Sequence, residues 1–322
     1  MTSKVRALFL GAALLAAGVA CALIAASRTS GEIDSHPTAA AVASATPSTP
    51  ASSDHLAPVL GSPSASQAQK TVVSTWSSGL KEALDGRAFA TEAWKHPESG
   101  GRYYASYVAD YCQGLREGPV AAQIQAPAEG TEGDVYVKKI AAFDRIKAFC
   151  EKFTDEELAA FAAAKMAGQK TGDSLFAASS RLAAASKARD SVARRTAIQE
   201  VLASQDPLLI DQLGPRLMVF PSATGGADFY FDGQRYPASS DPPVAAALYL
   251  LPCGLGLGCD ALGDLPLTLQ CATSSACYAD RFEKARVELA GGDEAKYQRI
   301  MAAYQSMLTA VKAGEGQKFV PK

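Results

Sequence analysis

Two Cys-x5-Cys units lie close together in the C-terminal half of the chain, and they restrict its fold more than any other feature. They are Cys253/Cys259 and Cys271/Cys277, and the first encloses three glycines that permit a tight loop. Four cysteines can pair in three ways, which the sequence alone leaves open. A zinc site is disfavoured because structural zinc ligands are usually spaced Cys-x2–4-Cys. We therefore expect disulfides here and no metal.

The compartment is indicated by the N-terminus, where Lys4 and Arg6 precede an apolar run over residues 7–26. About 20 apolar residues are enough to span a bilayer, so residues 1–28 are an export signal, either cleaved or, slightly preferred, retained as an anchor. The positive-inside rule then places the rest of the chain outside the cytoplasm. We expect a cell-envelope protein that is anchored in the inner membrane or secreted to the periplasm.

Six cysteines follow this segment, and an even number in an oxidising compartment favours three disulfides. Cys112 and Cys150 lie on apolar helix faces, and the long loop between them can bring them together. The simplest scheme adds two local bonds, Cys253–Cys259 and Cys271–Cys277.

Composition divides the rest of the chain into four regions. Residues 29–70 are rich in Ala, Ser, Thr and Pro and are predicted to be a disordered linker. Helical periodicity predicts an N-terminal helical region over 71–215 and a C-terminal, cysteine-rich helical region over 243–316, separated by an irregular hairpin segment over 216–242. The predicted fold is mainly α, a helical array or bundle held by disulfides. A repeat-like arrangement is left open, because no clean period establishes one.

Local signals place several helix boundaries. Thr154 and Glu157 form a capping box, and Asp206-Pro207 supplies an N-cap and a first helical residue for a helix that should end at Gly214. Another helical stretch, over 173–203, should break once near 188–191. Apolar stripes follow helical spacing, and the aromatic one can line a groove for glycan or peptide, although core packing is the commoner explanation. The two stripes of interest are Trp76, Leu80 and Leu84, and Tyr104, Tyr107, Val108, Tyr111, Cys112 and Leu115.

Asp232-Gly233 lies between two short aromatic runs and is the strongest hairpin signal in the chain. Packing onto the helices is the commoner explanation for such side chains. They are nevertheless the best candidates for contact with a partner, because aromatic side chains at a hairpin tip are hard for their own fold to bury. The candidates for partner binding are Phe229, Tyr230, Phe231 and Tyr236.

The remaining sequence excludes more chemistry than it indicates. With 31 basic and 33 acidic residues, the chain has no electrostatic signature for nucleic acid. The region after the linker has one histidine, His96, next to a proline, and we find no motif for a nucleophile, a metal or a phosphate. No cofactor is expected.

Two functions remain. The first is a non-catalytic envelope protein that binds a protein or glycan partner. The alternative is a hydrolase that acts on an envelope polymer through a carboxylate pair, for which Asp155, Glu156 and Glu157 are available, although a helix cap also explains them. A carboxylate pair lining a concave pocket would favour the hydrolase.

The segment from Leu251 to Val311, with its paired Cys-x5-Cys units and two following helices, resembles the C-terminal region of uncharacterised helical proteins of proteobacteria that are secreted or lipid-anchored. Those proteins are expected to carry an acidic residue and a leucine in the first inter-cysteine loop and a glycine-rich second loop. Here the glycines are in the first loop and the second is Ala-Thr-Ser-Ser-Ala. The resemblance implies a helical, disulfide-linked fold and no known activity.

Overall fold

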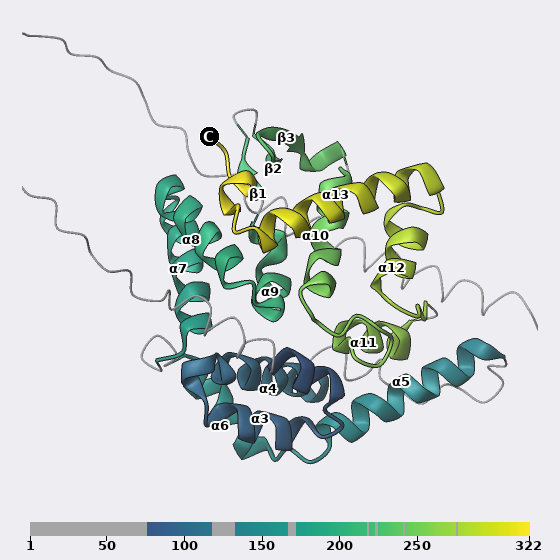
Figure 1. The fold of residues 1–322 in the computed structure, drawn as a ribbon. Helices are drawn as coiled ribbons and strands as arrows, with labels where there is room; N and C mark the ends of the chain where they lie inside the picture. The colour runs from purple at the N-terminus through teal and green to yellow at the C-terminus, as the bar shows by residue number, and fades with distance from the viewer. Residues whose placement is uncertain are drawn as a thin grey trace, which may run out of the picture. The chain divides into compact units, whose positions relative to one another are not determined.

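The fold is known from a computed structural model that describes residues 76–117, 133–166, 172–217, 219–222, 225–240, 242–274 and 276–322. The predicted signal segment 1–28 and linker 29–70 lie outside these residues. Within the described ranges, no helix is both long enough and apolar enough to cross a membrane. These parts of the chain are mainly helical with one small sheet, as expected (Figure 1).

Helices make up the first part of the described chain. Residues 76–82 are helical, and the elements that follow are α3 (Gly86–Trp94), η1 (Pro97–Ser99), α4 (Gly101–Glu117), α5 (Asp134–Cys150) and α6 (Asp155–Met166). Helix α4 packs against both α3 and α6 (Figure 1). The approach of α3 to α4 requires glycine at position 101, because a Cβ there would lie 2.1 Å from the carbonyl oxygen of Ala93.

The next three helices are α7 (Ser174–Ala188), α8 (Ser191–Ser204) and α9 (Pro207–Leu217). The predicted break is confirmed, because Arg189 has a φ of 56° and Asp190 caps α8. The predicted end of α9 at Gly214 is wrong. The helix continues to Leu217, past the glycine and proline at 214 and 215.

A three-stranded antiparallel sheet follows, with the order β1 (Val219–Pro221), β2 (Ala227–Phe231) and β3 (Gln234–Pro237). Phe231 pairs with Gln234, which leaves Asp232 and Gly233 as a two-residue turn. Both turn residues have positive φ, 52° and 77°, as a type I′ turn requires. The predicted hairpin is confirmed.

The C-terminal part contains η3 (Ala238–Ser240), α10 (Pro243–Gly254), α11 (Leu265–Thr273), α12 (Arg281–Lys284), the π-turn η4 (Ala285–Leu289), α13 (Glu294–Lys312) and η5 (Gly316–Phe319). Helix α10 packs against α9 and α13, and α11 packs against α5. Helix α11 was not predicted. The chain also contributes to the core beyond the predicted boundary at 316, since Phe319 and Val320 are buried.

One apolar cluster connects helices from both parts of the described chain and the sheet. A small second cluster, centred on Ile146 and Cys271, joins α5 to α11. Leu84 does not extend the predicted apolar face, because it lies beyond the helical residues 76–82 and its side chain is 73 % exposed.

The six cysteines form three disulfides, Cys112–Cys150, Cys253–Cys259 and Cys271–Cys277, with Cα–Cα distances of 5.3, 5.6 and 4.4 Å. This pairing is the simplest of those that the sequence leaves open. The first bond joins α4 to α5, and the other two close short loops after α10 and α11. Three disulfides are compatible with a protein of an oxidising, extracytoplasmic compartment.

Candidate binding cleft

A cleft of about 680 Å³ lies between α4, α7 and α9. This volume is within the range of small-molecule sites. The lining residues are Tyr103, Ser106, Tyr107 and Asp110 from α4, Phe176, Ser179, Ser180 and Ala183 from α7, and Gln212 and Leu213 from α9.

A buried carboxylate joins two walls of the cleft. Asp173 caps α7 and accepts hydrogen bonds from the backbone N–H groups of Leu175 and Phe176 at 2.9 and 3.1 Å. Its other oxygen accepts from the backbone N–H of Tyr103, in the first turn of α4, at 3.1 Å. Burial raises the pKa of Asp173 although these bonds favour the charged form. The start of α7 is therefore fixed against the start of α4.

A second buried carboxylate joins the third wall. Asp206 caps α9 by accepting from the backbone N–H of Leu209 at 2.7 Å, as the Asp-Pro signal predicts. The hydroxyl of Tyr104, on α4, donates to its other oxygen at 2.9 Å. Asp206 is fully buried, and burial raises its pKa to about 7. Helix α4 is thus connected to both α7 and α9 by hydrogen bonds in which the N-cap carboxylate of the other helix is the acceptor.

The cleft offers aromatic surface and hydrogen-bonding groups together. The rings of Tyr103 and Phe176 meet edge to face with centroids 5.3 Å apart, and Tyr107 is half-buried beside them. The hydroxyl of Ser106 is buried and has no hydrogen-bond partner. A buried hydroxyl without a partner costs free energy, so a ligand that supplies one gains affinity. The aromatic stripe of α4 is thus divided, because Tyr104 packs in the core while Tyr107 lines the cleft.

The predicted hairpin aromatics lie on the stem of the hairpin, because Asp232 and Gly233 form its tip. Phe231 is buried, and its ring packs against that of Phe319 with centroids 5.1 Å apart. Phe229, Tyr230 and Tyr236 are half-buried against the core, and Tyr230 meets the ring of Phe220 edge to face. Phe231 therefore packs in the core, as the alternative allows, and the other three side chains are only partly accessible. Their role in partner binding stays a prediction.

Two of these aromatics line a second cleft, which we call the hairpin groove. It has a volume of about 610 Å³ and lies between the hairpin, α13 and η5. Phe231 and Tyr236 form part of one wall, and small and polar side chains of α13, including Ala302, Ser306 and Thr309, form the other. The hydroxyl of Tyr236 donates to the side-chain oxygen of Gln234 at 2.7 Å.

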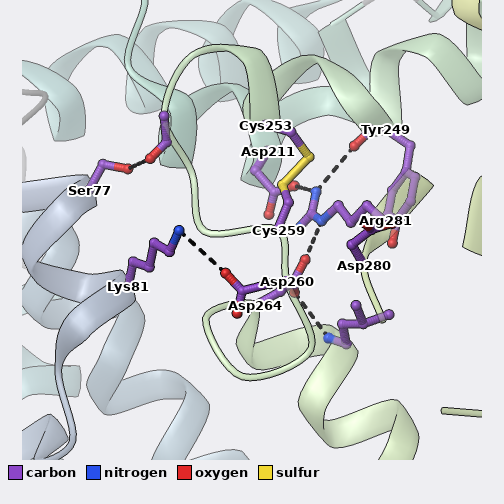
Figure 2. Close-up of a disulfide and its surroundings, with 12 residues drawn as sticks. Ser77, Lys81, Asp211, Tyr249, Cys253, Cys259, Asp260, Asp264, Asp280 and Arg281 are labelled. Carbon is purple, nitrogen blue, oxygen red and sulfur yellow. Dashed lines mark hydrogen bonds and ion pairs between the residues drawn. A yellow bond between two sulfur atoms is a disulfide. The ribbon is translucent and has the colours of Figure 1, made fainter. Parts of the chain in front are cut away.

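A buried ion cluster holds the C-terminal part of the fold together (Figure 2). Arg281 is 2 % exposed and bonds through Nε to Asp264, the N-cap of α11. Its Nη1 donates to Asp211 of α9 at 2.5 Å and to the carbonyl oxygen of Tyr249 at 3.2 Å. Its backbone N–H donates to the carbonyl oxygen of Cys259 at 3.0 Å. Every charge in this cluster has a partner, which indicates a structural role.

The Cys253–Cys259 loop is also tied to the start of the described chain, as Figure 2 shows. The hydroxyl of Ser77 donates to the carbonyl oxygen of Gly256 at 2.7 Å, and the ammonium of Lys81 lies 3.4 Å from the carboxylate of Asp260. Residues that are distant in sequence therefore meet at this disulfide.

Two other titratable groups singled out in the sequence, Glu157 and His96, have structural partners. Thr154 and Glu157 form the predicted capping box, with N···O distances of 3.0 and 3.2 Å, and Glu157 also pairs with Arg87. His96 is exposed on the surface, with its ring nitrogens 3.2 and 3.4 Å from two glutamates. Within the described ranges, no group of three or more His, Cys, Asp or Glu side chains is placed to hold a metal ion.

Sequence reasoning gave a groove on the aromatic stripe of α4 only as an alternative to core packing, and it missed the ion cluster. Asp211 and Arg281 belong to no recognisable motif. From the sequence alone, each would be taken for a surface residue of its helix. Comparison with known proteins adds no relative, because the chain matches no family model, no curated protein and no solved structure.

Proposed function

We propose that the protein is a non-catalytic cell-envelope protein that binds a glycan in the cleft between α4, α7 and α9. The observation that carries this proposal is the buried, unpartnered hydroxyl of Ser106 beside aromatic rings in a cleft with braced walls. A sugar ring has an apolar C–H face and an edge of hydroxyl groups. The face fits an aromatic wall, and the hydroxyls fit the side chains of Ser106, Ser180 and Gln212.

The hydrolase alternative is less well supported. Glycoside hydrolysis needs two carboxyl groups that flank the scissile bond. Among the described residues that line the cleft, Asp110 is the only acidic one. Asp211 lies next to the lining residue Gln212, but it is paired with Arg281. The arrangement favours binding over general acid–base chemistry.

The periplasm is the compartment we propose, because three disulfides require an oxidising environment to persist. Residues 7–26 lie outside the described ranges, so secretion and membrane anchoring both remain compatible with this proposal. Osmotic release of the periplasm distinguishes the two, because a secreted protein leaves with the soluble fraction and an anchored protein stays with the membranes.

A protein partner is a second candidate, and the hairpin groove favours it. Phe231 and Tyr236 line that groove, and Tyr236 is half-buried, so part of its ring is accessible. Cross-linking from Gln305, which also lines the groove, in intact cells would identify such a partner.

A blocked cleft tests the glycan proposal. Ala183 and Ala184 are neighbours on α7 and both are exposed, but only Ala183 lines the cleft. The variant Ala183→Trp fills the cleft with an indole, whereas Ala184→Trp places the same group on the surface and serves as the matched control. Binding is measured by calorimetry with peptidoglycan fragments and other soluble envelope glycans.

We expect the wild type and Ala184→Trp to bind at least one of these glycans and Ala183→Trp to bind it at least tenfold more weakly, with similar thermal stability for both variants. Equal affinity of the two variants would refute the cleft as the site.

A further inference from the structure

Exposed apolar side chains are concentrated at α5. Among the described residues, six large apolar side chains are exposed, and four of them belong to this helix or to two loops bound to it. The four are Val135 and Val137, in the first turn of α5, and Leu84 and Leu262, in the loops at 83–85 and 261–263. The first turns of α5 extend past α11 in Figure 1. The other two exposed side chains, Val192 and Val287, lie on α8 and η4.

Arg145 holds the two loops against α5. Its Nη2 donates to the carbonyl oxygen of Ala83 at 2.5 Å, and its Nε donates to that of Leu262 at 3.3 Å. The helical rise places Val137 about 12 Å along the axis from Arg145. Lys138 lies seven residues before Arg145 and therefore on the same side of the helix. The first turns of α5 and the two leucine loops thus form one surface, which we call the α5 surface.

The charge of α5 is positive. The helix has four basic residues, Lys138, Lys139, Arg145 and Lys147, and two acidic ones, Asp134 and Asp144. Within the described ranges, none of the four cations forms an ion pair. Arg145 is half-buried, its Nη1 is buried without a hydrogen-bond partner, and burial lowers the pKa of its guanidinium. A cation that loses water without gaining an anion costs free energy, so this surface favours an anionic partner.

The arrangement of these side chains favours lipid over a protein as that partner. Neighbouring residues of a helix point in directions about 100° apart, so Lys138 and Lys139 face different sides, and so do Val135 and Val137. One face of a folded partner would reach only part of this set. A fluid headgroup layer surrounds the end of a helix and offers phosphate charge directly above apolar acyl chains, so it can meet all of them.

We propose that α5 docks the protein on an anionic lipid surface. Val135 and Val137 enter the boundary between headgroups and acyl chains, Lys138 and Lys139 bind lipid phosphates, and the two leucine loops extend the contact along the helix. This docking is independent of the glycan proposal. It holds the cleft near the membrane surface whether residues 7–26 are retained or removed.

A tryptophan in the first turn of α5 reports this contact in the full-length, oxidised protein. Val137→Trp and the control Val192→Trp add the same ring at exposed positions, and the native tryptophans contribute equally to both. The proteins are mixed with vesicles of phosphatidylcholine, alone or with about 30 % phosphatidylglycerol, whose acyl chains carry bromine. Bromine quenches only an indole that touches it. Residues 7–26 could bring the whole protein to a bilayer, and comparison of the two positions separates that effect from docking by α5.

We expect anionic vesicles to quench Val137→Trp at least about threefold more strongly than Val192→Trp, and neutral vesicles to quench both weakly. Lys138→Glu with Lys139→Glu should raise the lipid concentration for half-maximal quenching by about tenfold or more, because each lysine adds attraction to an anionic surface. Lys187→Glu with Lys312→Glu changes the charge equally at exposed positions on α7 and α13 and should have a much smaller effect. Should Val137→Trp lower the thermal stability, Leu84→Trp serves as a second reporter.

Several results would overturn the proposal. They are equal quenching of Val137→Trp and Val192→Trp, equal quenching by neutral and anionic vesicles, and charge reversals at 138 and 139 that act no more strongly than the control pair. Absence of quenching in both Val137→Trp and Leu84→Trp overturns it as well. If cross-linking from position 137 in intact cells then reaches a protein, the α5 surface binds protein and not lipid. None of these results bears on the cleft, because its affinity for glycans is measured separately.

Discussion

The buried carboxylate of Asp206 should make the stability of this protein decrease as pH rises through neutrality. Burial raises its pKa from the usual 3.8 to about 7, although hydrogen bonds from Leu209 and Tyr104 favour the charged form. The folded protein therefore keeps this proton up to about pH 7, whereas the unfolded chain releases it near pH 4. Between these values the folded state binds more protons, so the free energy of unfolding falls as pH rises.

The size of this effect follows from the shift. Each pKa unit corresponds to about 1.4 kcal/mol, so the full shift amounts to about 4 kcal/mol and the part between pH 5 and pH 8 to about 2–3 kcal/mol. The variant Asp206→Asn mimics the protonated acid. Its amide oxygen still accepts from Leu209, so the cap of α9 is kept, and its amide N–H can donate to the oxygen of Tyr104.

We expect the stability of Asp206→Asn relative to the wild type to rise by about 2–3 kcal/mol between pH 5 and pH 8, and the carboxylate to make no difference only below about pH 4, where it is protonated in both states. Urea unfolding followed by circular dichroism, with the disulfides intact, measures both proteins across this range. Other buried acids titrate in both proteins, so the difference between them isolates Asp206. A difference that stays constant from pH 5 to pH 8 would refute the reasoning.

Asp85→Asn is the control with the opposite sign. Asp85 caps α3, and its pKa is lowered mainly by the hydrogen bond from Lys152 and by the N–H of Ala88. A lowered pKa contributes stability that is fully present above the unfolded value and is lost only in acid. The cost of Asp85→Asn should therefore be constant from pH 5 to pH 8 and begin to fall only below about pH 4.

Three further predictions concern stability. Phe231→Ala should cost about 3–5 kcal/mol in urea unfolding because its ring is buried, whereas the half-buried Tyr236→Ala should cost clearly less; equal costs would contradict the assigned burial. Arg281→Met should cost about 3–5 kcal/mol because it leaves two carboxylates unpaired, and a neutral result by the same assay would mean that the ion cluster does not hold the fold. Replacing both Cys112 and Cys150 by alanine should cost about 4 kcal/mol, against about 2 for either local disulfide, since the sequence separations are 38 and 6; thermal unfolding that ranks them the other way would contradict this order.

The features that the sequence predicts correctly are those fixed by neighbouring residues. The capping box joins Thr154 to a glutamate three residues later, and the turn at Asp232-Gly233 needs only two residues with positive φ. The glycine-rich first cysteine loop is only half explained in this way. Gly256 has a φ of 106°, but Gly254 is favoured for another reason: a Cβ there would lie 2.5 Å from the side chain of Leu308 of α13, which would have to move. That reason is a contact across the chain, which spacing does not reveal.

Helix α11 begins with a strong local signal. Asp264 is an N-cap and a proline follows within two residues, a signal similar to Asp206-Pro207. It was not predicted because it lies between the two cysteine units, where loops were expected. Arg281 illustrates the opposite case, because no local pattern distinguishes it from a surface arginine. Its burial follows only from Asp211 and Asp264, which lie on two other helices.

The cleft combines both kinds of information, which explains why it could be predicted only in part. The sequence identifies Asp206 as a cap, and Asp173 begins a predicted helical stretch, but each carboxylate also receives a bond from α4, 70 or 102 residues away. These second bonds fix the starts of α7 and α9 against α4, and so they hold the three walls of the cleft together. Because a buried acid costs more free energy than an exposed cap, we infer that the position of α4 against α7 and α9 is what these two residues secure. The aromatic face of α4 is thereby held at the cleft, and the glycan binding proposed for it depends on that placement.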